Sequence, residues 1–255
     1  MIQRPHDTGT GGVAPLPVGP ISLAADTGIQ DVFKEIAKDG DRTKAIADAI
    51  AEAFAQGRKV LVLTERIEHL NALQAALTGR IQTLYALHGR MSKKQRAALT
   101  AELDAMGADV PRVLLATGRL VGEGFEHPPL DTLVLAMPIS WKGTLQQYAG
   151  RLRRAYAGKH HVCIIDFIDV GHPALLRMWE RRRRGYQAMG YQISADAVSD
   201  ALAFDMAAPE EGEVPPYRMR ATVKRGSSSP YPPRNQIISN GPGPAGGGKI
   251  RSNAA

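Results

Sequence analysis

The residues best suited to chemistry in this sequence are a glutamine and two arginines past its midpoint. Gln147, Arg151 and Arg154 are spaced i, i+4 and i+7, so on a helix all three project from one face. Arginine is always charged, and its planar fork of donors matches the oxygens of a phosphate group. Gly150 would let a ligand approach the backbone closely. The pattern indicates a phosphate-binding helix, although a helix with a solvated basic face would show the same spacing.

Three apolar runs upstream of this helix each end in polar, small or basic residues. If the runs are parallel strands, their carboxyl ends meet at one edge of a sheet, where ligands bind in open α/β folds. A glycine-rich loop, Gly122–Glu126, follows the third run. The runs with their ends are Val60–Leu63 with Thr64–Arg66, Thr83–Leu87 with His88–Gly89, and Arg112–Ala116 with Thr117–Gly118.

Short apolar runs alternate with helical patterns along the body of the chain. Continuously apolar strands separated by helices predict an α/β fold, with a parallel sheet covered by helices on both faces. Asp41 is the expected cap of the first clear helix, which ends at Gly57. Later strands are expected at Thr132–Ala136 and Val162–Ile168, and later helices at 93–106, 144–154 and 174–189.

The two ends of the chain have a different composition. Residues 1–27 are rich in Gly and Pro without periodicity and predict a flexible leader. Residues 196–255 hold eight of the 17 prolines and predict a disordered tail. The predicted folded domain is therefore 28–195.

Composition excludes several classes of protein. The formal net charge of +7 favours a polyanionic partner. The single cysteine, Cys163, permits no internal disulfide and no thiolate metal cage, and we expect no metal site. No apolar run is long enough to span a membrane and no apolar signal core is present, so a cytoplasmic location is expected.

Taken in order, these elements resemble the C-terminal RecA-like lobe of superfamily 2 helicases, in the branch of restriction-type and DNA-repair translocases. The resemblance covers residues 58–190. Motif VI, of the form Gln-x-x-Gly-Arg-x-x-Arg, matches Gln147–Arg154. Motif V is similar to Ala116–Glu126, and motif IV to Val60–Arg66. The implied fold is a single RecA-like domain.

The resemblance also implies roles for individual residues. Arg151 and Arg154 would act on the ATP γ-phosphate as an arginine finger, with Gln147 orienting them. The residues implied to contact the nucleotide are Gly124, Glu126 and Gly150, with Glu126 at the ribose. At the position of Glu126 the family usually has Asp, and its loop is usually one residue shorter. The implied contacts to nucleic acid are Thr64, Arg66, His88, Gly89, Thr117 and Gly118.

A complete motor also needs a phosphate-binding loop and a DExx motif for Mg²⁺. Gly243–Lys249 fits Gly-x-x-x-x-Gly-Lys, but Ile250 follows where a metal-binding hydroxyl is required, and no strand precedes it. No DExx sequence follows an apolar strand. We therefore expect ATP and Mg²⁺ to be held mainly by an N-terminal lobe on another chain, and no ATP hydrolysis by this chain alone.

Two interpretations of the whole protein stay open. In the first, the chain is a helicase lobe that works with a partner lobe, or the product of a truncated helicase gene. In the second, it is a non-catalytic module for nucleic-acid binding or assembly that derives from such a lobe. DNA is favoured over RNA as the partner.

Further charged residues lie outside these motifs. The stretch Trp141–Arg184 is strongly basic, and either nucleic-acid contact or a solvated surface would account for it. The four arginines Arg181–Arg184 wrap around a helix and cannot form one face. Asp166 and Asp169 are three apart on a strand and should face opposite sides, which argues against paired acid–base catalysis.

Overall fold

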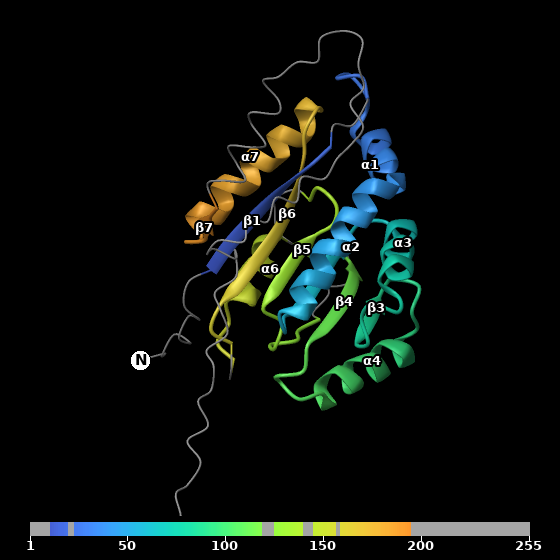
Figure 1. Cartoon of the computed structure of the whole chain (residues 1–255), viewed down its shortest axis with the longest axis vertical. Helices are drawn as coiled ribbons and strands as arrows, with labels where there is room; N and C mark the ends of the chain where they lie inside the picture. The colour runs from blue at the N-terminus through green and yellow to red at the C-terminus, as the bar shows by residue number, and fades with distance from the viewer. Residues whose placement is uncertain (1–10, 20–22, 119–124, 140–144, 157–158, 195–255) are drawn as a thin grey trace, which may run out of the picture. The chain divides into compact units, whose positions relative to one another are not determined.

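A computed structural model describes residues 11–19, 23–118, 125–139, 145–156 and 159–194 (Figure 1). All of them belong to one unit of the chain, Met1–Met219. Within these ranges, seven parallel strands form one sheet in the order β3-β4-β2-β5-β6-β1-β7. The strands are β1 Gly11–Val18, β2 Lys59–Thr64, β3 Leu84–Leu87, β4 Arg112–Thr117, β5 Thr132–Leu135, β6 Val162–Asp169 and β7 Gln192–Ile193.

Helices cover both faces of this sheet, so the predicted α/β fold is confirmed. On one face α1, α2 and α3 pack together, and α2 crosses in front of the sheet in Figure 1. On the other face, Leu61 and Leu63 of β2 share a core with side chains of α4, α6 and α7. The helices are α1 Ile29–Lys38, α2 Gly40–Ala55, α3 Ile67–Leu77, α4 Lys93–Ala105, α6 Gln146–Leu152 and α7 Pro173–Ala188.

The ends of α2 differ in part from the sequence-based prediction. Its cap is Asp39, whose side chain accepts a hydrogen bond from the backbone N of Arg42 at 2.9 Å. The predicted cap, Asp41, instead lies in the first turn, where its charge suits the helix dipole. Gly57 follows the helix at φ 80°, a conformation that favours glycine, as expected.

The predicted flexible leader is wrong for Gly11–Val18. This segment is β1, which pairs with β6 along its whole length and buries Val13 and Val18. The carbonyl of Val13 accepts from Ser194 on the β7 side, and strand residues alternate sides, so Pro15 and Pro17 also face that side. Because β7 pairs only with Gly12 and Val13, the missing N–H groups of the two prolines interrupt no β1–β7 pairing.

Two buried ion pairs attach helices to opposite faces of β6. Arg42 of α2 donates to Asp169 from Nε at 2.6 Å and from Nη2 at 3.1 Å. Arg182 of α7 donates to Asp166 from Nε at 2.7 Å and from Nη2 at 2.9 Å. The two aspartates therefore face opposite sides of the sheet, as their spacing predicted, and each is occupied by a guanidinium.

None of the helices that the structure describes is both long and apolar enough to cross a membrane. The described ranges also contain no group of three or more His, Cys, Asp or Glu side chains placed to hold a metal ion.

Candidate functional site

The carboxyl ends of β2, β3 and β4 lie side by side, as the sequence predicted. Thr64 at the end of β2 is in register with Thr117 at the end of β4. Leu87 of β3 is in register with Ala116, which places His88 beside the same end of β4. The fold therefore brings the three strand ends to one edge of the sheet.

The residues at this edge differ in how accessible they are. Thr64 is 1% exposed, and its hydroxyl lies 3.0 Å from Nδ1 of His69, so it contributes to the protein interior. Arg66 is half-buried and donates to the carbonyl of Gln30 in α1 at 3.3 Å. Both residues, which the sequence predicts to contact nucleic acid, are thus bonded to other residues of the protein.

Other groups at the edge remain open to a ligand. Thr117 and Gly118 are half-buried, and Gly89 is exposed. No atom of the described residues lies within 4 Å of the position where a side chain on either glycine would begin. The buried Nδ1 of His88 has no hydrogen-bond partner among the described residues. The open part of the edge is therefore His88, Gly89, Thr117 and Gly118.

The helix that carries the predicted phosphate clamp is shorter than expected. α6 ends at Leu152, and it buries Tyr148, Ala149 and Leu152 against the sheet while Gln147 and Gly150 are exposed. Arg154 therefore lies beyond the helix rather than on its face.

Arg151 and Arg154 nevertheless converge on one carboxylate. Nη1 of Arg154 lies 2.9 Å from Oε1 and 3.0 Å from Oε2 of Glu126, and Nε of Arg151 lies 3.7 Å from Oε1. The Arg151 side chain is 27% exposed and that of Arg154 is 56% exposed, so solvent reaches both. The predicted ribose ligand and the two predicted finger arginines thus form one cluster.

This cluster borders a pocket beside α6. Nη1 of Arg151 lies 3.4 Å from the carbonyl oxygen of Phe125, and burial raises the pKa of the Tyr148 phenol. The Tyr148 hydroxyl lies 3.5 Å from the carbonyl of Gly118, which connects the pocket to the open strand edge. The lining residues are Leu61, Phe125, Glu126, His127, Pro128, Leu130, Tyr148, Arg151, Leu152 and Arg154.

Two glycines that the sequence predicts to contact the nucleotide, Gly124 and Gly150, add little to the description of the pocket. Gly124 lies outside the described residues. At Gly150, an added side chain would meet only Cε of Met189 at 3.7 Å, an ordinary contact, so the described protein itself does not require glycine there.

Sequence reasoning missed buried polar residues that support the pocket. Arg112 is fully buried, donates to the carbonyls of Val110 and Leu103 at 3.0 and 3.1 Å, and lies 3.1 Å from Nε2 of His127. Burial and the positive charge of Arg112 lower the pKa of His127. No pattern distinguished Arg112 from an ordinary residue at the start of a strand.

Comparison with known proteins relates part of this chain to helicases. The model of the helicase conserved C-terminal domain matches residues 41–156, which include the strand edge, the pocket and α6. Within the chain, residues 41–156 are thus similar to the C-terminal domain of helicases. The parallel sheet with helices on both faces has the fold of a RecA-like helicase lobe.

Two curated relatives of this helicase domain are viral proteins. L396 of Acanthamoeba polyphaga mimivirus, assigned as an ATP-dependent RNA helicase, is 24% identical over 63% of the chain. D10 of Escherichia phage T5, assigned as a helicase, is 29% identical over 53% of the chain. The chain spans only 29% of the length of each.

The crystal structure of UvsW from T4 has a similar fold. The match covers 72% of the present chain and 40% of the UvsW chain, with a TM-score of 0.56 and 16% sequence identity.

Proposed function

We propose that this chain is the C-terminal lobe of an ATP-dependent nucleic-acid helicase or translocase and supplies an arginine finger to ATP. The observation that carries the proposal is the convergence of Arg151 and Arg154 on the Glu126 carboxylate. A carboxylate and a phosphate oxygen accept the same forked hydrogen bonds from guanidinium groups. The fold therefore holds two cations around a position suited to an anion.

In the proposed reaction, the γ-phosphate of ATP replaces Glu126 as the partner of the two guanidinium groups. They would stabilise the charge that spreads over the transferring phosphoryl group, with Gln147 orienting them. Glu126, once released, would be free to accept a hydrogen bond from a ribose hydroxyl. Arginine fingers contribute about 10³–10⁵ in rate in nucleotide hydrolases.

The open strand edge is the proposed contact for the nucleic-acid backbone. The hydroxyl of Thr117 and the backbone around Gly118 and Gly89 can donate to phosphate oxygens, and the Tyr148–Gly118 contact offers a route from this edge to the nucleotide. The relatives' names cover helicases of RNA and helicases without a stated substrate. We favour DNA, in the branch of restriction-type and repair translocases that motifs IV to VI resemble.

The nucleotide itself requires a second lobe. The sequence contains neither a complete Gly-x-x-x-x-Gly-Lys-Ser/Thr motif nor a DExx motif. An N-terminal lobe with both motifs would hold ATP and Mg²⁺, and without it we expect no hydrolysis.

The test is nucleic-acid-stimulated ATP hydrolysis by this chain together with such an N-terminal lobe. Arg151→Ala and Arg154→Ala should each lower kcat by at least about 10³. Lys44→Ala, which removes an exposed charge paired with Asp48, should leave kcat unchanged. If both arginine variants hydrolyse ATP at the wild-type rate, the finger assignment is wrong.

The second candidate is a non-catalytic nucleic-acid-binding or assembly module. It is favoured by the same ion pairs, because Glu126 already neutralises part of the charge of Arg151 and Arg154 within the lobe. This candidate gains if the chain binds nucleic acid with a steep salt dependence, yet no N-terminal lobe restores hydrolysis.

A further inference from the structure

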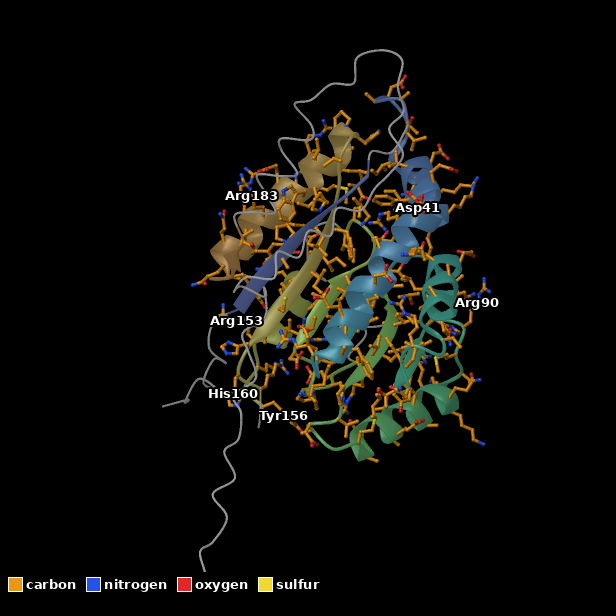
Figure 2. The ribbon with its side chains drawn as sticks, in the orientation of Figure 1. Asp41, Arg90, Arg153, Tyr156, His160 and Arg183 are labelled. Carbon is orange, nitrogen blue, oxygen red and sulfur yellow. The ribbon has the colours of Figure 1, made fainter. Side chains whose placement is uncertain are left out.

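The tertiary structure divides the four consecutive arginines of α7 between different environments. Arg182 is 1% exposed and bound to Asp166. Arg183, labelled in Figure 2, is half-buried and donates to Glu180 at 2.8 Å. Arg181 and Arg184 are exposed. The run is therefore not a uniform basic collar around the helix.

A third exposed arginine completes a stripe along α7. Arg177, Arg181 and Arg184 are spaced i, i+4 and i+7, so they fall within about 60° of arc on the helix. The buried residues of the same helix, Leu175, Trp179 and Tyr186, centre on the opposite side. We name the three exposed side chains the α7 arginine stripe.

No carboxylate of the described residues neutralises the stripe. The only acidic residue of α7, Glu180, is paired with Arg183, and within the described part of the chain none of the three stripe guanidinium groups is hydrogen-bonded or ion-paired. Like charges at this spacing disfavour a helix by about 0.2–0.5 kcal/mol per pair. The stripe thus consists of three positively charged side chains that face solvent and repel one another.

Other cations of the same basic stretch are already engaged. Arg154 binds Glu126, Arg153 donates to the carbonyl of Met189, and Lys159 donates to the carbonyl of Pro128 at 3.2 Å. Burial lowers the pKa of Lys159 to about 8. Among the described cations of the stretch Trp141–Arg184, those without such a partner therefore lie on α7.

We infer that the α7 arginine stripe is a second binding surface for the phosphate backbone of nucleic acid, separate from the open strand edge. The stripe spans about 10 Å along the helix axis, because each residue rises about 1.5 Å. Each of the three guanidinium groups can bind one phosphate, which gives up to three phosphate contacts along one strand. Arginine suits this partner because its fork binds phosphate oxygens in a bidentate manner.

The stripe lies on a different part of the sheet from the open strand edge. α7 packs on β6 and β7, whereas the strand edge is formed by β2, β3 and β4 on the far side of β5. A strand bound at both surfaces would pass over the carboxyl side of the sheet, where α7 begins at Pro173 just after β6. This inference rests on nucleic acid being a partner, which is part of the proposed function.

The experiment is a titration of the full chain with a fluorescently labelled single-stranded 20-nucleotide DNA, followed by anisotropy between 50 and 200 mM NaCl. Each phosphate contact on a single strand contributes about −0.7 to the slope of log K against log salt. Three lost contacts reduce the slope by about 2, so the R177A/R181A/R184A variant should lose about 20-fold less affinity than wild type over this range.

Two matched variants separate the stripe from total charge. K38A/K44A/R80A removes three exposed, ion-paired cations from the other face of the sheet and should keep the wild-type slope. A triple Arg→Lys variant of the stripe keeps the charge and should retain most of the slope. Thermal unfolding checks that all three variants are folded, since exposed substitutions change stability by about 0.5 kcal/mol or less.

The outcomes distinguish this inference from the proposed function. An unchanged slope in R177A/R181A/R184A, or an equal drop in K38A/K44A/R80A, overturns the stripe while nucleic-acid binding stands. If wild type binds no DNA at any salt concentration, both the stripe and the proposed nucleic-acid partner are wrong. Loss of ATP hydrolysis in Arg151→Ala or Arg154→Ala, with an unchanged salt slope, leaves the stripe intact.

Discussion

The clearest prediction from the fold concerns Arg182, which is in the middle of the run of four arginines Arg181–Arg184. Its guanidinium makes two bonds to Asp166 and one to the carbonyl of Ile139 at 3.3 Å. Burial opposes the charge of Arg182, but Asp166 beside it holds its pKa above the ordinary value. The pair is therefore charged and excluded from water.

Among the described residues, Arg182→Ala leaves the carboxylate of Asp166, which is 1% exposed, with only the hydroxyl of Tyr186 at 2.9 Å. Removing one partner of a buried ion pair costs about 3–5 kcal/mol, because the other charge stays buried without compensation. Native domains are stable by about 5–15 kcal/mol, so the variant should lose a large fraction of its free energy of unfolding.

The assay is urea unfolding at pH 7 of Arg182→Ala and of Arg181→Ala, its exposed neighbour. Arg181→Ala should change the free energy of unfolding by about 0.5 kcal/mol or less. The double variant D166L/R182M should recover most of the loss, because an apolar pair carries no desolvation penalty. A loss below about 1 kcal/mol in Arg182→Ala, or equal losses at the two positions, would refute the buried-pair interpretation.

Three further predictions follow from the described structure. Burial, with the nearby charge of Arg42, lowers the pKa of His69 to about 3. In the unfolded chain a histidine has a pKa of about 6.5, so the unfolded state gains a proton that the folded state does not bind as the pH falls. The free energy of unfolding should therefore decrease by about 1.4 kcal/mol from pH 7.5 to pH 5.5 because of this group. His69→Gln should flatten that part of a urea-midpoint profile, and an unchanged profile would contradict the assignment. Glu126→Gln should raise the affinity of the chain for pyrophosphate by about fivefold or less in calorimetry, because an exposed ion pair contributes about 1 kcal/mol at most; weaker binding would instead show that the carboxylate is no competitor. Val13→Ala should lower the free energy of unfolding by about 2 kcal/mol in thermal or urea unfolding, because the side chain is buried in β1. If residues 11–18 were instead a flexible leader, Val13→Ala would change stability no more than Pro17→Ala, a substitution at an exposed position.

The sequence alone was sufficient for much of the fold and part of the candidate site. The strands around Val62, Leu115 and Ile164 were predictable because a strand buried on both faces must be continuously apolar. The strand ends were predictable because parallel strands bring their carboxyl ends to one edge. Arg151 and Arg154 were predictable because, together with Gln147 and Gly150, they place several hydrogen-bond donors for phosphate on a short segment.

Tertiary structure decided the features that depend on partners far away in the chain. β1 was not recognised because its prolines indicate a loop, and only the short β7 on one side shows why a strand tolerates them. Asp39 rather than Asp41 caps α2, a difference of two residues that local propensity does not resolve.

The arginines of α7 show the same division most plainly. Their spacing determines which side chains share a face of the helix, since that depends only on the 100° turn per residue. Which face is buried depends on where α7 meets β6, and there Asp166 compensates Arg182 inside the core while Arg177, Arg181 and Arg184 point to solvent. Burial of the Arg182 charge depends on the opposite charge of Asp166, and that partner is 16 residues away in the chain.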